Sequence, residues 1–450
     1  MAIETEIKLR ASRETLAALR QSPLFNPSRQ QLWRTHELNN TYFDTPDFAL
    51  ARARVALRIR QDGQQLIQTL KTKGASVAGL SARNEWDWSI SEARLDLSLL
   101  TGECWPQQLQ ELDKNSLAGI FTTNFTRQAT ELQLHNAGLA YSLEVALDLG
   151  TAATATGASE EICELELELR QGQPWQLLAL ALQLAQQYPL MPCDISKAER
   201  GYRLLQPDSF DLQVQPALLQ ADSSMDEAIG SLAAQLLSAS QRLAEQYRHS
   251  GRWKLLERWI QSLVDLRALL SSPGQIIPRR SSSKIRTLLD ELLADWYPVY
   301  QGGMQQQVRE QAVEQFAREL EQTRWGCLSL EFALWLQQGS WKNQRSARAE
   351  RQAGAALERW LQRYLREQLE KIPLQKPTAG LLQEQQPRIE RTLFWLEYAR
   401  DVLAPGQLDE LFGELRKLYQ IMLLSQDVEQ LSRQAARVWQ NAALQQLLKG

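Results

Sequence analysis

Apolar and polar side chains alternate through most of the first 205 residues, which is typical of half-buried β-strands. In the opening segment Glu4, Glu6 and Lys8 are separated by Thr5 and Ile7. The same period of two predicts further strands at Val55–Arg60, Gln65–Lys73, Arg83–Ile90, Ser142–Leu149 and Ile162–Arg170.

Turn signals and short helical patterns separate these strands. Asp62-Gly63 lies between two of them and predicts a tight hairpin, and the segment 135–138 predicts another. Short helices are predicted at Ser12–Gln21, Ser91–Leu99, Gln107–Asn115 and Pro174–Tyr188.

The second half of the chain repeats its apolar residues with the period of an α-helix, 3.6 residues. Helices are predicted at Asp226–Tyr247, Trp253–Leu270, Ser283–Trp296, Gln305–Glu321, Ala347–Leu369, Arg388–Leu403 and Leu408–Leu418. The polar segment 206–224, which contains Pro207 and Pro216, is the predicted linker. We therefore predict an α+β protein with a strand-rich domain at 1–205 and an all-α domain at 225–450.

The polar faces of the predicted strands carry dense charge of both signs. Glu164, Glu166 and Glu168 share one face, and such a row of like charges persists more easily when cations neutralise it. Hard divalent cations prefer carboxylate oxygens, whereas rows of arginine and lysine suit a polyanion. A closed barrel of about eight strands can hold a small ligand inside. The alternative is that these faces are solvated and carry surface ion pairs of little energetic value.

Composition narrows the class of protein. The net charge of -3 gives no basic field for nucleic acid, and no apolar run reaches the length of about 20 residues that spans a bilayer. The four cysteines show no metal-ligand spacing, which favours a reducing, cytoplasmic compartment. Three histidines in the whole chain disfavour a histidine-based metal site.

The charged motifs resemble, in order, those of the CYTH superfamily, the triphosphate tunnel metalloenzymes. The resemblance covers about residues 1–205 and rests on Glu4-Thr-Glu6-Ile-Lys8, Tyr42-Phe43-Asp44-Thr45, Leu57–Arg60, Thr69-Leu70-Lys71, Arg83-Asn84-Glu85, Arg127, Glu144–Asp148, Glu164–Glu168 and Ser196-Lys197. The helical half resembles a CHAD domain, and the layout looks like that of the bacterial CYTH–CHAD inorganic triphosphatases.

This resemblance implies an eight-stranded antiparallel tunnel that holds two Mg²⁺ or Mn²⁺ ions. The implied metal ligands are Glu4, Glu6, Asp148, Glu164, Glu166 and Glu168. The implied phosphate-binding residues are Lys8, Arg58, Arg60, Lys71, Arg83, Arg127 and Lys197. Catalytic roles are implied for Glu6, Lys8, Lys71, Arg127 and Asp148. Which of the three glutamates at 164–168 bind metal stays open, and Asp148 holds either a basic residue or the second metal.

The implied activity is metal-dependent hydrolysis of inorganic triphosphate to pyrophosphate and phosphate. Relatives also act on thiamine triphosphate and nucleoside triphosphates, but the first half shows no insertion that would read a thiamine or a base. A different class of function is a polyphosphate-binding adaptor that acts through the CHAD half. In that half the segment 247–254 keeps one histidine, His249, and acids and bases nearly balance from residue 206 onward. Polyphosphate binding there is therefore an open expectation, with neither nucleic acid nor membrane expected as a partner.

Overall fold

The computed structural model of the 450-residue chain describes residues 2–26, 32–72, 74–77, 79–207, 219–375, 377–403, 405–424 and 427–449. The chain forms two compact units, Met1–Val214 with Leu237–Trp259 and Asp295–Gln338, and Gln215–Leu236 with Ile260–Ala294 and Gly339–Gly450. The predicted domain boundaries stay a prediction. Residues 208–218 of the predicted linker, and Lys73 of a predicted strand, lie outside the described residues.

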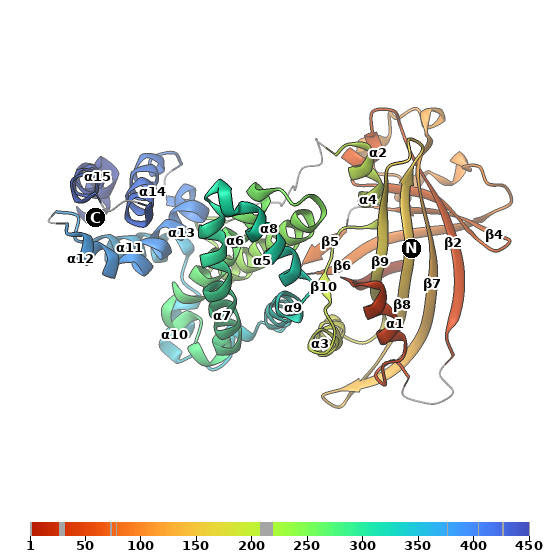
Figure 1. Cartoon of the computed structure of the whole chain (residues 1–450), viewed down its shortest axis with the longest axis horizontal. Helices are drawn as coiled ribbons and strands as arrows, with labels where there is room; N and C mark the ends of the chain where they lie inside the picture. Colours follow the sequence, from red (N-terminus) through yellow and green to blue (C-terminus); the bar gives the residue numbers. More distant parts are fainter. Residues whose placement is uncertain are drawn as a thin grey trace. The chain divides into compact units, whose positions relative to one another are not determined.

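The first half folds into an antiparallel barrel (Figure 1). Eight strands close in the order β1-β9-β8-β7-β2-β3-β4-β6, and β6 pairs back onto β1. Two short strands, β5 and β10, extend the sheet beyond the closure. The predicted eight-stranded antiparallel fold is therefore confirmed. The strands are β1 Ala2–Arg10, β2 Arg34–Asp44, β3 Ala56–Asp62, β4 Gln65–Lys71, β5 Ala75–Val77, β6 Leu80–Ile90, β7 Ala118–Asn136, β8 Leu139–Thr154, β9 Ser159–Gln171 and β10 Met191–Pro192.

The strand register places charged side chains inside the barrel and apolar ones outside. Glu6 lies opposite Glu168 and Lys8 opposite Glu166, where β1 pairs with β9. Their neighbour Leu167 points the other way and is fully buried. A slip of one residue would exchange these two faces, so the apolar outer layer fixes which side chains enter the barrel.

Four helices accompany the barrel strands in sequence, at α1 Arg13–Arg20, α2 Ala49–Arg52, α3 Pro174–Ala185 and α4 Lys197–Leu205. Helix α3 packs on β1 and β9, and α4 packs on β7, β8 and β9. Helix α4 approaches Phe121 so closely that a Cβ on Gly201 would lie 2.2 Å from its ring. Glycine at this position therefore allows α4 to pack against the barrel.

Two helices predicted from the sequence, at 91–99 and 107–115, are wrong. The structure has short 3-10 turns there instead, at η1 Leu97–Leu99, η2 Gly102–Cys104, η3 Gln107–Leu109 and η4 Lys114–Ser116. The side chains of Asp96 and Asp113 each accept a hydrogen bond from a backbone N–H two residues on, which competes with a helix. Apolar residues of this connection, including Leu100 and Trp105, pack against Leu57 of β3 instead of forming a helical face.

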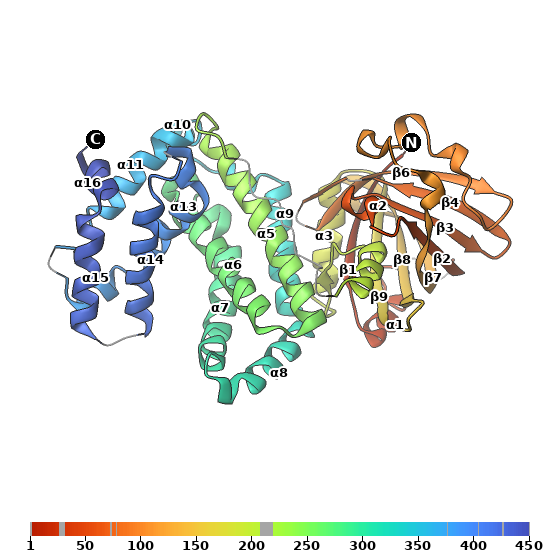
Figure 2. The same ribbon diagram turned by 90° about the horizontal axis from the view of Figure 1, so that it is seen from above.

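The remainder of the chain is helical, as predicted (Figure 2). Its helices are α5 Met225–Ser250, α6 Trp253–Ser271, η5 Gly274–Ile276, α7 Arg279–Gly303, η6 Gln306–Val308, α8 Arg309–Leu320, α9 Thr323–Gln337, η7 Ser340–Lys342, α10 Ala347–Ala353, α11 Leu357–Leu369, α12 Ala379–Glu384, α13 Gln386–Leu403, α14 Asp409–Leu424, α15 Val428–Gln440 and α16 Ala442–Lys449. Across the described residues, no helix combines the length and the apolar character needed to cross a bilayer.

The helix predicted at 347–369 is interrupted between α10 and α11. Ala356 forms an isolated β-bridge with Ser224, and Leu357 donates its backbone N–H to the carbonyl of Ser223. These backbone groups bond to the residues before α5 rather than to a helical turn. The apolar period continues across the break, so it could not reveal the interruption.

Candidate active site

The barrel encloses a cavity of about 300 Å³. Of the side chains predicted to form the site, most line this cavity: Glu4, Glu6, Lys8, Arg58, Arg60, Lys71, Arg83, Arg127, Glu166, Glu168 and Lys197. The other two, Asp148 and Glu164, are fully buried and are not among the lining residues. Strand alternation therefore brings the predicted acids and bases together on one interior surface.

Other polar side chains that line the cavity were not among the predicted site residues: Tyr42, Thr69, Glu85, Asp87, Glu144, Arg170 and Ser196. Several of them carried a signal in the sequence. Glu85 and Asp87 continue the face of Arg83 along β6, and Glu144 shares the face of Asp148 on β8. The same alternation that predicted the site could have included these acids.

Three carboxylates in the barrel wall form what we call the inner cluster: Asp148, Glu164 and Glu166. One oxygen from each lies within 4.8 Å of the others. The Nζ atom of Lys197 lies 2.7 Å from Asp148, 2.5 Å from Glu164 and 2.9 Å from Glu166. Arg127 donates two further bonds to Asp148, at 2.8 and 2.7 Å. Bases of the chain itself therefore already neutralise the inner cluster.

The pKa values of the inner cluster agree with this pairing. Burial raises the pKa of Asp148, but Arg127 and Lys197 outweigh it and leave the pKa below its ordinary value. Burial likewise raises the pKa of Glu166, and Lys197, Lys8 and Arg127 bring it well below the ordinary value. A cation entering this cluster would have to displace the ammonium group of Lys197.

Four further carboxylates form what we call the open cluster: Glu4, Glu6, Glu144 and Glu168. In the strand register Glu168 lies directly opposite both Glu6 and Glu144. Burial and the charge of Glu4, followed by Glu144 and Glu6, raise the pKa of Glu168 to about 7, although Arg170 opposes this rise. The open cluster therefore carries negative charge that its neighbours do not fully neutralise. Oxygen donors of this kind fit a hard divalent cation better than the inner cluster does.

An excess of positive charge lies around Arg60. Burial and the neighbouring charges of Arg58 and Arg127 lower its pKa to about 9. Its Nε donates to Asn40 at 2.9 Å, and no carboxylate of the described residues forms an ion pair with it. A buried cation without an acidic partner is costly unless an anion binds it. This part of the cavity therefore suits an anionic ligand.

Two lysines of the cavity, Lys8 and Lys71, each lie between two carboxylates. Lys8 pairs with Glu6 and lies 3.4 Å from Glu166. Lys71 lies 2.7 Å from Glu4 and 3.0 Å from Glu85. Each lysine is therefore shared between two carboxylates.

The start of α4 explains how Lys197 enters the barrel wall. Ser196 caps the helix by accepting a hydrogen bond from the backbone of Glu199, whose side chain accepts one from the backbone of Ser196 in return. The hydroxyl of Tyr202, further along α4, donates to Asp44 at 2.7 Å. The motif residues Asp44 and Ser196 thus hold the helix that supplies Lys197.

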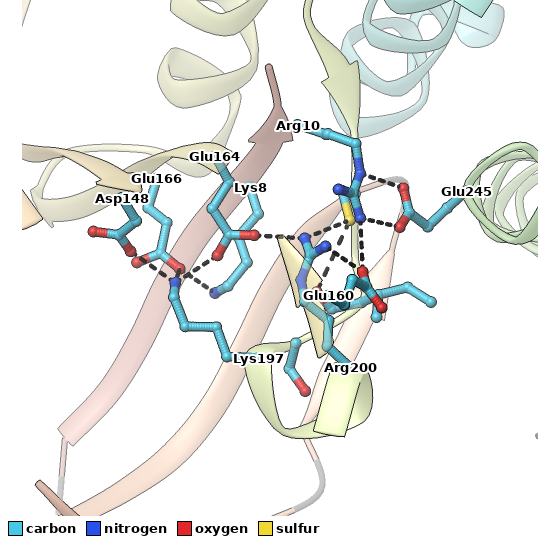
Figure 3. A network of polar contacts seen from close by, with 12 residues as sticks. Lys8, Arg10, Asp148, Glu160, Glu164, Glu166, Lys197, Arg200 and Glu245 are labelled. Carbon is cyan, nitrogen blue, oxygen red and sulfur yellow. Dashed lines mark hydrogen bonds and ion pairs between the residues drawn. The ribbon is translucent and has the colours of Figure 1, made fainter. Parts of the chain in front are cut away.

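Behind Glu164 lies a second set of ionised residues that the sequence analysis missed: Arg10, Glu160, Arg200 and Glu245 (Figure 3). Arg203 belongs to the same set, because its Nε donates to Glu160. Arg10 could have been found, because it continues the alternate row of Glu4, Glu6 and Lys8 on β1. No local pattern pointed to Glu245, which lies on α5, 235 residues from its partner Arg10.

Solved structures that the chain resembles include a putative adenylyl cyclase from Hippeastrum, described as having a dominant triphosphatase activity. It is 21% identical with a TM-score of 0.33, covering 44% of this chain and 95% of that one. A putative adenylate cyclase from Bacillus halodurans is 23% identical with a TM-score of 0.27, covering 41% and 88%. Similarity at TM-scores this low supports no inference about fold or activity.

Among curated proteins, an inorganic triphosphatase from Haemophilus influenzae is 34% identical over 167 residues. The match covers 37% of this chain and 46% of that protein, so the two agree over about half of the relative's length. The family of CYTH domains matches residues 2–202, which span the whole barrel and most of α4. Over residues 2–202 this chain therefore matches the CYTH domain family.

Proposed function

We propose that this chain hydrolyses inorganic triphosphate to pyrophosphate and phosphate inside the barrel, with the help of a divalent metal. The observation that carries the proposal is the unequal distribution of charge in one cavity. The four carboxylates of the open cluster share three bases, Lys8, Lys71 and Arg170, whereas Arg60 has no acidic partner among the described residues. A metal-bound polyphosphate offers both missing partners at once. The curated relative that matches part of the chain is itself an inorganic triphosphatase.

The open cluster is the proposed place for metal, with Glu4, Glu6, Glu144 and Glu168 as the oxygen donors. A divalent cation such as Mg²⁺ or Mn²⁺ would there neutralise phosphate charge and lower the pKa of a bound water. The proposed number of bound divalent metal ions remains two. In the inner cluster, Asp148 and Glu164 hold Arg127, Arg200 and Lys197 in place.

The cationic side chains of the cavity bind and orient the phosphate groups in this proposal. Arg58, Arg60 and Arg127 come from different strands, β3 and β7, and meet inside the barrel. Hydrogen bonds from charged donors to phosphate oxygens are short and strong, and guanidinium groups can make two at once. Phosphoryl transfer to water depends mainly on positioning and charge neutralisation, so the chain needs no covalent nucleophile.

The cavity favours a bare triphosphate over a nucleotide or thiamine ester. Tyr42 is the one aromatic side chain among the described residues that line it. Its ring already stacks on Phe121, with ring centroids 4.8 Å apart. Tyr42 is only 4% exposed, so it offers little aromatic surface to a base or a thiazole ring.

The proposal is tested by measuring phosphate release from inorganic triphosphate, thiamine triphosphate, ATP and long-chain polyphosphate, each with Mg²⁺, Mn²⁺ or EDTA. We expect the largest kcat/KM for inorganic triphosphate and no release in EDTA. A larger kcat/KM for a nucleotide or thiamine ester would mean that this ester is the preferred substrate, while the assignment of the site would stand. Binding of polyphosphate without any metal-dependent hydrolysis would favour an adaptor and refute the proposed reaction.

A further inference from the structure

A line of buried ion pairs leads away from the cavity toward helix α5 (Figure 3). It begins at Lys197, which lies 2.5 Å from one oxygen of Glu164. The other oxygen of Glu164 accepts a hydrogen bond from Arg200 at 2.6 Å. Arg200 also donates to Glu160 at 2.9 Å. Glu164 therefore joins a cation that lines the cavity to a cation outside it.

Glu245 of α5 lies at the far end of this line, within the first compact unit. Its carboxylate accepts two hydrogen bonds from Arg10, one of them from Nε at 2.8 Å, and lies 3.3 Å from Arg203. The side chain of Glu245 is 1% exposed. Burial raises its pKa, but Arg10, Arg200 and Arg203 more than reverse this, so the carboxylate is charged.

The charges in this part of the barrel do not balance without Glu245. Three buried arginines, Arg10, Arg200 and Arg203, meet Glu160 and Glu245 there, and Arg200 also pairs with Glu164, whose other oxygen Lys197 occupies. The exposed Arg248 and His249 lie next to them on α5 and add no negative charge, since burial and Arg203 lower the pKa of His249. If Glu245 is lost, the nearest further carboxylate bonded to these arginines is Glu164.

We propose that Glu245 is a positioning residue for the cavity, which acts through Arg200 and Glu164 to hold Lys197 in place. While Glu245 satisfies the outer arginines, Glu164 can divide its two oxygens between Arg200 and Lys197. Without Glu245, Arg10 and Arg203 compete for Glu160, which also pairs with Arg200. Arg200 then competes more strongly for Glu164, and Lys197 loses one of its three carboxylates. This inference rests on the proposed function in one respect, because Lys197 is assumed to bind a phosphate group.

The first test replaces Glu245 by glutamine in the full chain and measures kcat and KM for triphosphate. If Lys197 is displaced, the substrate loses a charge-assisted hydrogen bond, so KM should rise by about 10-fold. The rise should exceed the change in kcat, because Lys197 contacts the substrate before the reaction as well as during it. Glu245→Asp, which keeps the charge, should recover part of the wild-type KM.

The matched control is Asp226→Asn, at the other end of the same helix. Asp226 also makes a two-bond pair with a buried arginine, Arg345, but none of its partners lines the cavity. It should lower stability while leaving KM within about twofold of wild type, as expected for a site distant from the substrate. An equal rise in KM for both variants would show that Glu245 is merely structural, and would overturn the proposal.

A double-mutant cycle with Lys197→Ala tests whether Glu245 acts through Lys197. In the Lys197→Ala background, Glu245→Gln should change KM by less than about twofold, because coupled residues are not additive. Independent, multiplicative effects on KM would overturn the proposal. If the wild type does not hydrolyse triphosphate at all, the proposed function fails, but the coupling between Glu245 and Lys197 can still be tested.

For that test, the free energy of unfolding in urea is measured for the same four proteins of the double-mutant cycle. Additive effects of the two substitutions on this free energy would overturn the inference.

Discussion

The inner and open clusters come from neighbouring positions on shared strands, yet they differ in which charges face them. The inner cluster holds its carboxylates within 4.8 Å of one another, but Lys197 and Arg127 neutralise them. In the open cluster, Glu168 faces two other glutamates and its pKa rises to about 7. Close carboxylates are therefore poor evidence for a metal site by themselves. The charge left after counting the bases of the protein is the better indicator.

The largest expected effect is a loss of folding stability when a carboxylate of the inner cluster is replaced. Asp148→Asn leaves the buried charges of Arg127 and Lys197 without a main partner, so the free energy of unfolding should fall by about 3–5 kcal/mol. Urea unfolding in EDTA measures it. As a control, Glu161→Gln breaks the exposed pair with Arg13 and should change stability by less than about 0.5 kcal/mol. Similar losses for both variants would contradict the structural role of the inner cluster.

The second prediction concerns activity in the open cluster. Glu6→Ala removes a proposed metal donor, so hydrolysis of triphosphate should fall by more than about 100-fold, since even residues that merely support metal ligands contribute 10- to 100-fold. Phosphate release measured over a range of Mg²⁺ concentrations, with circular dichroism to show a native fold, provides the test. Glu161→Ala on β9 serves as the control. A folded Glu6→Ala variant with near-normal turnover would contradict the assignment of metal to this cluster.

The third prediction concerns Arg60, the cation of the cavity that has no acidic partner among the described residues. Arg60→Gln removes a buried charge that has no acidic partner, so KM for triphosphate should rise by about 10-fold while stability is unchanged or higher. Steady-state kinetics and urea unfolding on one preparation measure the two effects. Unchanged kinetics would mean that Arg60 does not contact the substrate.

The smallest effect is a difference in pH dependence. The pKa of Glu168 is raised in the folded chain, so the folded state binds its proton more tightly than the unfolded state. In EDTA, stability should therefore fall as pH rises from about 4.5 to about 7, and then level off. Glu166 has a lowered pKa, so its contribution is present above its ordinary pKa and is lost as pH falls below it. Urea unfolding against pH should show both limbs, and Glu168→Gln should remove the first alone.

The barrel and most of its interior charges were predictable because both follow one short period. An opening β-strand requires Glu4, Glu6 and Lys8 to share a face, and in the register Glu6 and Lys8 meet β9 while Glu4 meets β6. The hairpin at Asp62 was equally local, since Gly63 adopts a φ of 58° there. The mistaken helices at 91–99 and 107–115 failed because aspartate side chains bond locally to the backbone, which an apolar count does not register.

The different charge environments of the three glutamates of β9 could not be predicted from the sequence. Glu164, Glu166 and Glu168 have the same residue type, the same face and the same spacing. What distinguishes them comes from elsewhere in the chain: Lys197 of α4 reaches the first two, whereas Glu4 and Glu144 raise the pKa of the third. Glu245 shows the same limit, since nothing near it in sequence indicates its partner Arg10.

The closure of the barrel by β1 has a consequence for the growing chain. This strand is made before both of its partners, β6 and β9, which end at residues 90 and 171. Pairing over such separations is slow, because the loop must close before the contact stabilises it. On the ribosome, the carboxylates of β1 therefore remain in water until β9 has left the exit tunnel. Up to that point in synthesis the closed interior does not exist, so the proposed metal and phosphate sites cannot form before the barrel is complete.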